Sequence, residues 1–343
     1  MKQFMEQIIA NDSLRQRLCS DILNDRLSHA YIIEGVKGSG KHTIARAAAA
    51  ALSCENKGND IMPLPCGECR SCKKILGSIS PDVITVGCGD RVTMGVDSIR
   101  FLREDIYVIP NDLDYKVYII EDADKMTEQA QNAFLLSLEE PPSYVLFLLL
   151  CEDSGAFLET IRSRAPVLRT EPVSREQIDA YICATDRRAA QMKMSEPHKY
   201  EELLMSAGNG IGQALELLEP KSFAPVLERR KLVKDFVSCA LDNSSREQAV
   251  ALMRAFSTKR EALSQELELI YSALRDILAV KKSDTVELCF YESMDTALEL
   301  SERVSATRLV KLCDAVFEIC ERVERNANVR LTLLSLLSNL EMI

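Results

Sequence analysis

The feature that most constrains this chain is a glycine-rich segment, GVKGSGKHT, which runs from Gly35 to Thr43. The residues before it, 29–35, are largely apolar and predict a short buried strand, whereas Lys41 to Leu52 is rich in alanine and predicts a helix. A glycine-rich turn at such a junction lets backbone N–H groups surround phosphate oxygens, and the helix N-terminus adds a favourable dipole. The segment therefore predicts a phosphate-binding loop; the alternative is a turn that binds nothing.

The anion cradle of this loop is expected to consist of three glycines and a lysine, Gly35, Gly38, Gly40 and Lys41. The position after the lysine is normally Ser or Thr, because that hydroxyl binds Mg²⁺. Here it is His42, and an imidazole is a poor magnesium ligand compared with oxygen. Thr43 follows one residue late, about 100° further round the helix. The loop leaves ATP or ADP binding open but predicts poorly placed magnesium and impaired hydrolysis.

A second motif, an apolar strand that delivers acids, completes the expected nucleotide site. Residues 117–120 are apolar and are followed directly by Glu121 and Asp122, at the strand end where α/β sheets bind ligands. The usual order is Asp then Glu, so each carboxylate is displaced by one methylene. An error of about 1 Å in positioning can lower a rate about 100-fold. The alternative is a solvated acidic helix cap.

Four closely spaced cysteines predict a metal site: Cys54, Cys66, Cys69 and Cys72. Zn²⁺ prefers four tetrahedral ligands, and thiolates at about 2.3 Å suit it. Four protein ligands leave no position for water or substrate, so the zinc would be structural. The alternatives are four reduced thiols without metal or a redox pair, and Cys88 is a less favoured substitute for Cys54.

The hydrophobic pattern divides the chain into an α/β part and a helical part. Alternating strands and helices in the first half predict a parallel sheet covered on both faces, with further strands at 81–86, 116–120, 145–150 and 166–169 and further helices at 96–104 and 127–139. From Ser174 onward the period is helical, with a helix at 213–218, a linker at 219–222 and four to six helices between 223 and 343. We therefore expect a core over 1–168 that includes the cysteine module (54–72), a small helical domain over 169–220 and a larger one over 221–343.

Composition excludes several classes of protein. The 42 Lys and Arg against 52 Asp and Glu give a net charge of −10, which argues against strong autonomous binding to DNA. The longest apolar run, Tyr144 to Cys151, is far shorter than the roughly 20 residues that span a bilayer. The first residues lack the apolar core of a signal peptide, and twelve cysteines are too few for a disulfide scaffold. We expect a cytoplasmic protein without a membrane partner.

Taken in order, these motifs resemble the bacterial clamp-loader AAA+ proteins of DNA polymerase III. The resemblance is carried by HAY at 29–31, the phosphate loop, the four cysteines, VDSIR at 96–100, the acidic strand end, NAFLLSLEEPP at 132–142 and Ser163-Arg164. It covers residues 5–220 strongly and extends weakly through NANVRL at 326–331. His29 itself is expected to pack before the strand; the alternative is a wall of the nucleotide pocket.

The resemblance implies a fold and a set of partners. The fold would be an α/β AAA+ P-loop core with a parallel sheet, followed by a small helical lid domain and an all-α collar domain. The collar would join the chain to gamma/tau and delta subunits in a ring of five, which opens the sliding clamp and places it on primed DNA. Four basic side chains could face the DNA backbone in that assembly, the alternative being a solvated helix face: Lys73, Lys74, Arg100 and Arg103.

Departures from the family pattern separate its two close members. Gamma/tau subunits hydrolyse ATP, whereas here the magnesium position is His42, the sensor-1 threonine falls near Cys151 or Glu152, and the sensor-2 arginine falls near Gly212. Arg164 is retained, and in the family this residue is a finger that reaches a neighbour's ATP; the alternative is a surface salt bridge. The resemblance therefore implies a delta-prime-like subunit with little or no ATPase activity. The alternatives are a gamma/tau-type ATPase and a zinc-stabilised adaptor unrelated to replication.

Overall fold

One parallel sheet organises the first part of the chain in the computed structural model, which describes residues 8–59, 61–89, 91–242, 246–283 and 285–324. Its strands within those residues are β1 (Ala30–Glu34), β2 (Val83–Val86), β3 (Lys116–Ile120), β4 (Val145–Cys151) and β5 (Val167–Arg169). Their order is β2-β3-β4-β1-β5, and every pairing is parallel. The predicted α/β core is confirmed, with β1 between β4 and β5.

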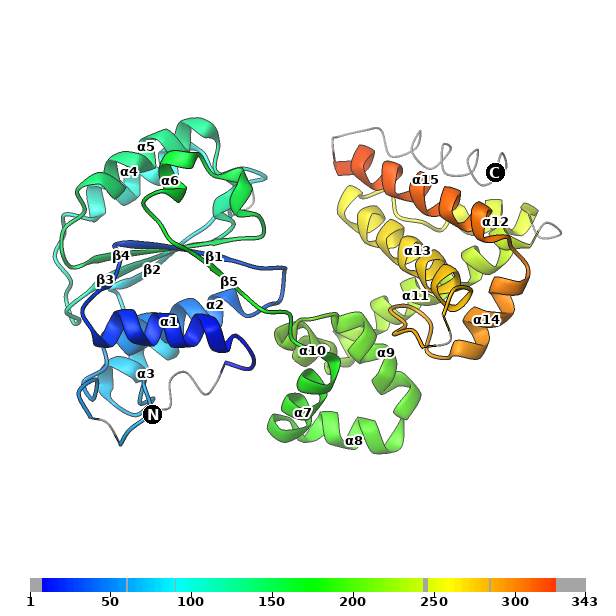
Figure 1. Ribbon diagram of the computed structural model, residues 1–343, viewed down its shortest axis with the longest axis horizontal. Coiled ribbons are helices and arrows are strands. Elements are labelled where there is room, and N and C mark those ends of the chain that lie inside the picture. Colours follow the sequence, from blue (N-terminus) through cyan, green and yellow to red (C-terminus); the bar gives the residue numbers. More distant parts are fainter. Residues whose placement is uncertain (1–7, 60, 90, 243–245, 284, 325–343) are drawn as a thin grey trace. The chain divides into compact units, whose positions relative to one another are not determined.

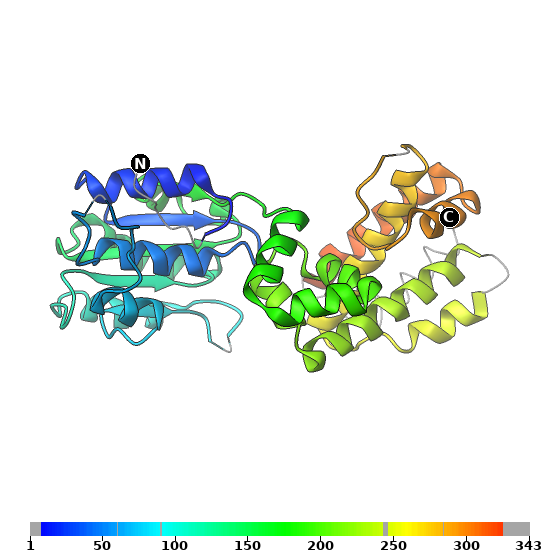
Figure 2. The ribbon, with the colours of Figure 1, turned by 90° about the horizontal axis from the view of Figure 1, so that it is seen from below.

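Helices cover both faces of this sheet (Figure 1). One face carries α1 (Asp12–Leu23), α2 (Lys41–Leu52) and α3 (Arg70–Leu76), with α2 between the other two (Figure 2); the other carries α4 (Val96–Asp105), α5 (Glu128–Glu139) and α6 (Glu159–Arg162). Successive strand residues alternate between the two cores: Ile33 packs on the α2 side and Ile32 on the α5 side. Both faces of each central strand are therefore buried, which explains the unbroken apolar runs in the sequence.

The rest of the described chain is helical. It contains α7 (Arg175–Thr185), α8 (Arg187–Ser195), α9 (Pro197–Ala207), α10 (Ile211–Leu217), α11 (Pro220–Leu241), α12 (Arg246–Met253), α13 (Arg260–Val280), α14 (Met294–Glu302) and α15 (Ala306–Glu324). None of the helices in the described residues is both long and apolar enough to cross a membrane.

The packing of Cα atoms divides the chain into two compact units. The first comprises Met1–Ala180 with Asn209–Gln213, and the second Tyr181–Gly208 with Ala214–Ile343. The three-domain division therefore stays a prediction. The linker expected at 219–222 is wrong, because α11 begins at Pro220 and proline is well tolerated in the first helical position. Up to residue 324 the described residues of this region contain five helices, α11 to α15; the expected number of four to six refers to 223–343 and stays a prediction, and the motif at 326–331 lies outside the described residues.

A buried carboxylate fixes the loop that leads into β3. Asp82, which is fully buried just before β2, accepts hydrogen bonds from the N–H groups of Asn111 and Asp112, both at 2.7 Å, and of Leu113 at 3.0 Å. The Asp112 carboxylate in turn pairs with Lys74 Nζ of α3 at 2.6 Å. Asp82 therefore connects the edge of the sheet, through this loop, to the helix that carries the last cysteine of the module.

We expect Asp82→Ala to lower the free energy of unfolding by about 3 kcal/mol, because it leaves three buried or half-buried N–H groups without their acceptor. Urea unfolding followed by circular dichroism measures this change. Asp114→Ala, at an exposed position of the same loop, is the matched control and should move the midpoint little. Equal midpoints for the two variants would contradict the role of Asp82.

Candidate functional site

The phosphate loop has the backbone shape that its glycines permit. It follows β1 and ends at Gly40, which precedes the first residue of α2. Gly38 and Gly40 have φ of +82° and +83°, in the left-handed region where a Cβ is strained. A Cβ on Gly38 would also lie 2.9 Å from the Cα of Gly210. Both glycines are therefore required by the conformation of the loop itself.

The loop presents hydrogen-bond donors at the start of α2. Within the described residues, no acceptor is recorded for the N–H groups of Lys41, His42 and Thr43, which belong to the first helical turn. The Lys41 ammonium folds back and donates to the carbonyl oxygens of Gly35 and Val36. Burial lowers the pKa of Lys41, while the Glu152, Asp124 and Asp122 carboxylates oppose that shift. The loop can therefore bind an anion.

The residues at the two magnesium positions contact each other instead. His42 Nδ1 lies 3.0 Å from Glu121 Oε1, and both side chains are at least one-third exposed. Asp122 pairs with Lys125 at 3.1 Å, and Asp124 accepts a hydrogen bond from the N–H of Glu152 at 2.9 Å. Magnesium requires an octahedron of oxygen ligands, and each of these carboxylates already has a partner. As arranged, the residues do not fit a magnesium ion.

The two sensor positions also lack the expected groups. Cys151 is the last residue of β4 and is buried; burial, and then the Asp124 carboxylate, raise the pKa of its thiol to about 12. Glu152 contributes its backbone N–H to Asp124 rather than a hydroxyl. Gly212 lies in α10 and has no side chain to contact a phosphate. The side chains at these three positions therefore provide no cation and no hydroxyl.

Arg164 lies at the other edge of the sheet from the phosphate loop. β1 and β5 are parallel, with Ile32 opposite Val167. Gly35 follows β1 by one residue, whereas Arg164 precedes β5 by three, so the two lie at opposite ends of this pair of strands. The guanidinium therefore cannot serve the phosphate loop of its own chain.

The Arg164 guanidinium is held by weak, accessible contacts. It donates to the carbonyl oxygen of Thr160 at 3.1 Å and lies 3.5 Å from Glu139 Oε1. Its side chain is 40% exposed, so water screens the ion pair with Glu139. Glu139, the last residue of α5, belongs to the EEPP run at 139–142 but was not expected beside the arginine. Such contacts position the side chain without fixing it.

The four cysteines of the module are brought together at the ends of α2 and α3. All four Sγ atoms lie within 4.8 Å of one another, and Cys66 and Cys72 Sγ are 3.9 Å apart. Tetrahedral thiolates at about 2.3 Å from zinc are about 3.8 Å from each other. Cys54, Cys66 and Cys72 are buried and Cys69 is half-buried, so water has little access. The donor set and its spacing fit a structural zinc ion, which Cys54, Cys66, Cys69 and Cys72 would hold.

Local hydrogen bonds favour a thiolate in this module. Burial would raise the pKa of Cys66, but hydrogen bonds from the Cys69 N–H and the Asn56 amide outweigh burial and lower it to about 6. Burial raises the pKa of Cys54 and Cys72, so these thiols need the positive charge of a metal to ionise. Cys88 packs on the opposite face of the sheet, beside the α4–α5 core, and does not replace Cys54.

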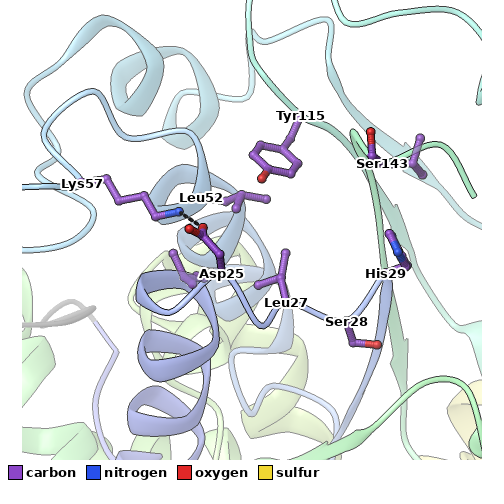
Figure 3. Close-up of a pocket in the computed structure, with 10 residues that line it drawn as sticks. Asp25, Leu27, Ser28, His29, Leu52, Lys57, Tyr115 and Ser143 are labelled. Atoms are coloured by element: carbon purple, nitrogen blue, oxygen red, sulfur yellow. Dashed lines mark ion pairs between the residues drawn. The ribbon is translucent and has the colours of Figure 1, made fainter.

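A cavity at the amino edge of the sheet is separate from the phosphate loop. It has a volume of about 120 Å³ and is lined by residues that precede β1, β3 and β4, among them His29, Tyr115 and Ser143 (Figure 3). Asp25 and Lys57 form an ion pair of 3.5 Å at its rim. His29 is exposed, so its expected packing is wrong, and it is no wall of the nucleotide pocket because it lies at the opposite strand end.

Two family models match most of this chain. Residues 10–174 match the model described as DNA polymerase III, delta subunit, and residues 227–342 match the C-terminal model of the same subunit. This chain belongs to the DNA polymerase III clamp-loader family. Its AAA+ fold agrees with a gamma subunit-related protein of Thermotoga maritima, which superposes with a TM-score of 0.51 at 20% identity over 96% of this chain and 99% of that one.

Relatives of two subunit types are similar to this clamp-loader chain. It is 29% identical to DNA polymerase III subunit tau of Bacillus subtilis over 91% of its own length, and it spans 57% of the length of tau. It is 27% identical to subunit delta' of the same organism, over 91% of each chain. The two identities differ too little to choose between the two subunits.

Elemental analysis of the purified chain should find about one zinc ion per molecule, since all four ligands are preorganised. We expect Cys69→Ser to abolish zinc binding and to lower Tm, because a zinc ion held by the four cysteines would link the end of α2 to α3. Cys88→Ser is the matched control and should retain the metal. A metal-free protein as stable as the untreated one, or loss of zinc in Cys88→Ser, would contradict this assignment.

Proposed function

We propose that this chain is a delta-prime-like subunit of the DNA polymerase III clamp loader. It offers the Arg164 guanidinium to ATP bound by a neighbouring subunit and hydrolyses little or no ATP in its own pocket. The observation that carries the proposal is the placement of Arg164 at the sheet edge opposite the phosphate loop. A finger in trans stabilises charge in the transition state and is worth about 10³–10⁵ in rate.

The arrangement of the chain's own pocket supports the second half of this proposal. Hydrolysis needs a magnesium ion that bridges the outer phosphates and a carboxylate that orients the attacking water. Here His42 and Glu121 are paired with each other, and Asp122 is paired with Lys125. Lys41 and the glycines, Gly35, Gly38 and Gly40, keep an anion cradle, so ATP or ADP binding without turnover is part of the proposal.

The accessibility of Arg164 supports the first half. Exposed ion pairs contribute about 0–1 kcal/mol to stability. Arg164 therefore loses little free energy when it leaves Glu139 to contact a phosphate in another subunit. A charge-assisted bond from a guanidinium to phosphate is stronger than the screened pair it replaces. The salt bridge considered as the alternative does exist, but it is exposed and long.

The proposed partners are the gamma/tau and delta subunits, the sliding clamp and, in the assembled loader, primed DNA in the cytoplasm.

The four basic side chains considered for DNA contact differ in whether they form an ion pair within the chain. Lys74 pairs with Asp112 and Arg100 with Asp97, which favours a solvated helix face for these two. Lys73 of α3 and Arg103 of α4 are both exposed and stay the better candidates for the phosphate backbone. An adaptor unrelated to replication is not supported, because the family matches cover both halves of the chain.

A gamma/tau-type ATPase is the second candidate, and one observation favours it. The chain is as similar to tau as it is to delta', over the same share of its length. That candidate requires His42 to leave Glu121 when nucleotide and magnesium bind. The two candidates differ in a quantity that is simple to measure, the phosphate released by the isolated chain.

We expect Arg164→Ala to reduce the clamp- and DNA-stimulated ATPase rate of a loader reconstituted with gamma/tau and delta severalfold. The rate of ATP hydrolysis in the pocket that Arg164 contacts should fall about 10³-fold. Pockets that do not contain Arg164 keep their rates, so the total rate falls by less. Arg164→Lys should not restore the rate, because an ammonium lacks the planar fork. Arg162→Ala, an exposed arginine two residues away, is the control and should not change it. An unchanged rate in Arg164→Ala with intact assembly excludes the finger.

Steady-state phosphate release by the isolated chain should equal that of Lys41→Ala, since neither protein can place magnesium at the outer phosphates. Release is followed with a phosphate-binding reporter in excess ATP and MgCl₂. Turnover that Lys41→Ala abolishes would support the gamma/tau-type candidate against the present proposal.

A further inference from the structure

The phosphate loop holds an imidazole where the family pattern places a magnesium ligand. His42 Nδ1 contacts Glu121, and within the described residues Nε2 has no hydrogen-bond partner. The two nitrogens of an imidazole point in different directions, so a ring held through Nδ1 keeps Nε2 available for a second partner. A ring that lies between a carboxylate and a phosphate oxygen can contact one with each of its two nitrogens. The loop thereby gains a side-chain contact for a phosphate without a metal ion.

A buried hydroxyl in the same loop lacks a partner. Ser39 is 4% exposed, and its Oγ makes no hydrogen bond within the described part of the chain. The hydroxyl is turned into the loop, 2.7 Å from the point that a Cβ on Gly35 would occupy. A buried polar atom without a partner is destabilising by about 1–3 kcal/mol. The hydroxyl is packed against Gly35, so a partner reaches it only when this part of the loop rearranges.

The carboxylates next to the loop, Glu121, Asp122 and Asp124, already have partners and do not form a magnesium site as arranged. To bind the ion, Glu121 would leave His42, and Asp122 would leave Lys125. Asp124 holds the backbone N–H of Glu152. The same rearrangement would separate the imidazole from its carboxylate. Magnesium and the His42–Glu121 pair therefore compete for one position.

We propose that this phosphate loop binds a nucleoside diphosphate or triphosphate as the metal-free anion. Lys41 and the N–H groups at the start of α2 contact the phosphates, and His42, oriented by Glu121, supplies the donor that replaces the metal. The inference rests on the proposed nucleotide site and specifies its ligand. Such a nucleotide is bound but not hydrolysed, because no group orients water and no ion bridges the outer phosphates.

Isothermal titration calorimetry of the full chain with ADP, in EDTA and in excess MgCl₂, tests the inference. We expect ADP to bind in EDTA at least as tightly as in MgCl₂. Lys41→Ala should abolish the heat in both buffers, which locates the site. His42→Ala should weaken binding in EDTA about tenfold, the effect of one lost charge-assisted hydrogen bond. His198→Ala, which removes an exposed histidine outside the loop, is the matched control and should bind as the parent does.

A restored motor pattern provides the converse experiment. The triple variant His42→Thr, Glu121→Asp and Asp122→Glu should bind ADP more tightly in MgCl₂ than in EDTA, provided that its melting curve matches the parent. Tighter binding of ADP to the parent in MgCl₂, or no binding in either buffer, overturns the inference. Absence of binding leaves the role of Arg164 untouched, because that role is measured on ATP held by another subunit.

Discussion

The parallel pairing of β1 with β5 determines how the chemistry of this chain is divided. In a parallel sheet all strands end at the same edge, so the loop after β1 and the segment before β5 cannot meet. The phosphate loop and the acids after β3 share the carboxyl edge, where His42 reaches Glu121. Arg164 lies beyond the amino edge. Strand direction therefore places the guanidinium at the edge opposite the pocket, whereas the side chains of His42, Glu121 and Asp122 occupy the metal positions of the pocket with ion pairs.

The cysteine module, together with the hydrogen bonds that Asp82 accepts from the loop at 111–113, stabilises the side of the core on which α2 lies. Cys54 follows α2, and Cys69 and Cys72 belong to the start of α3, so a zinc ion would join two helices of one layer. Asp82 binds the loop at 111–113, whose Asp112 pairs with Lys74 of α3. Protein contacts therefore attach α3 to the sheet, and a bound zinc ion would add a link between α3 and α2. These contacts lie at the end of α2 opposite the phosphate loop.

Local patterns predicted the fold because the strands are apolar runs and the loop is a contiguous motif. The strand at 116–120 and the helix at 41–52 have the expected bounds. The pairing of His42 with Glu121 was not predicted, because it depends on strand order across a sheet and not on spacing. Helix α1 was missed although Leu14, Leu18 and Ile22 repeat every four residues on one buried face. Asp82 gave no signal, because a lone carboxylate before a strand is common on surfaces.

The most direct measurement compares two variants in one reconstituted loader, Lys41→Ala in this chain's own pocket and Arg164→Ala at its opposite edge. The account predicts that the first leaves clamp-stimulated ATP hydrolysis at the parent rate and that the second lowers it severalfold. The reverse pattern, with hydrolysis lost in Lys41→Ala and retained in Arg164→Ala, would contradict it.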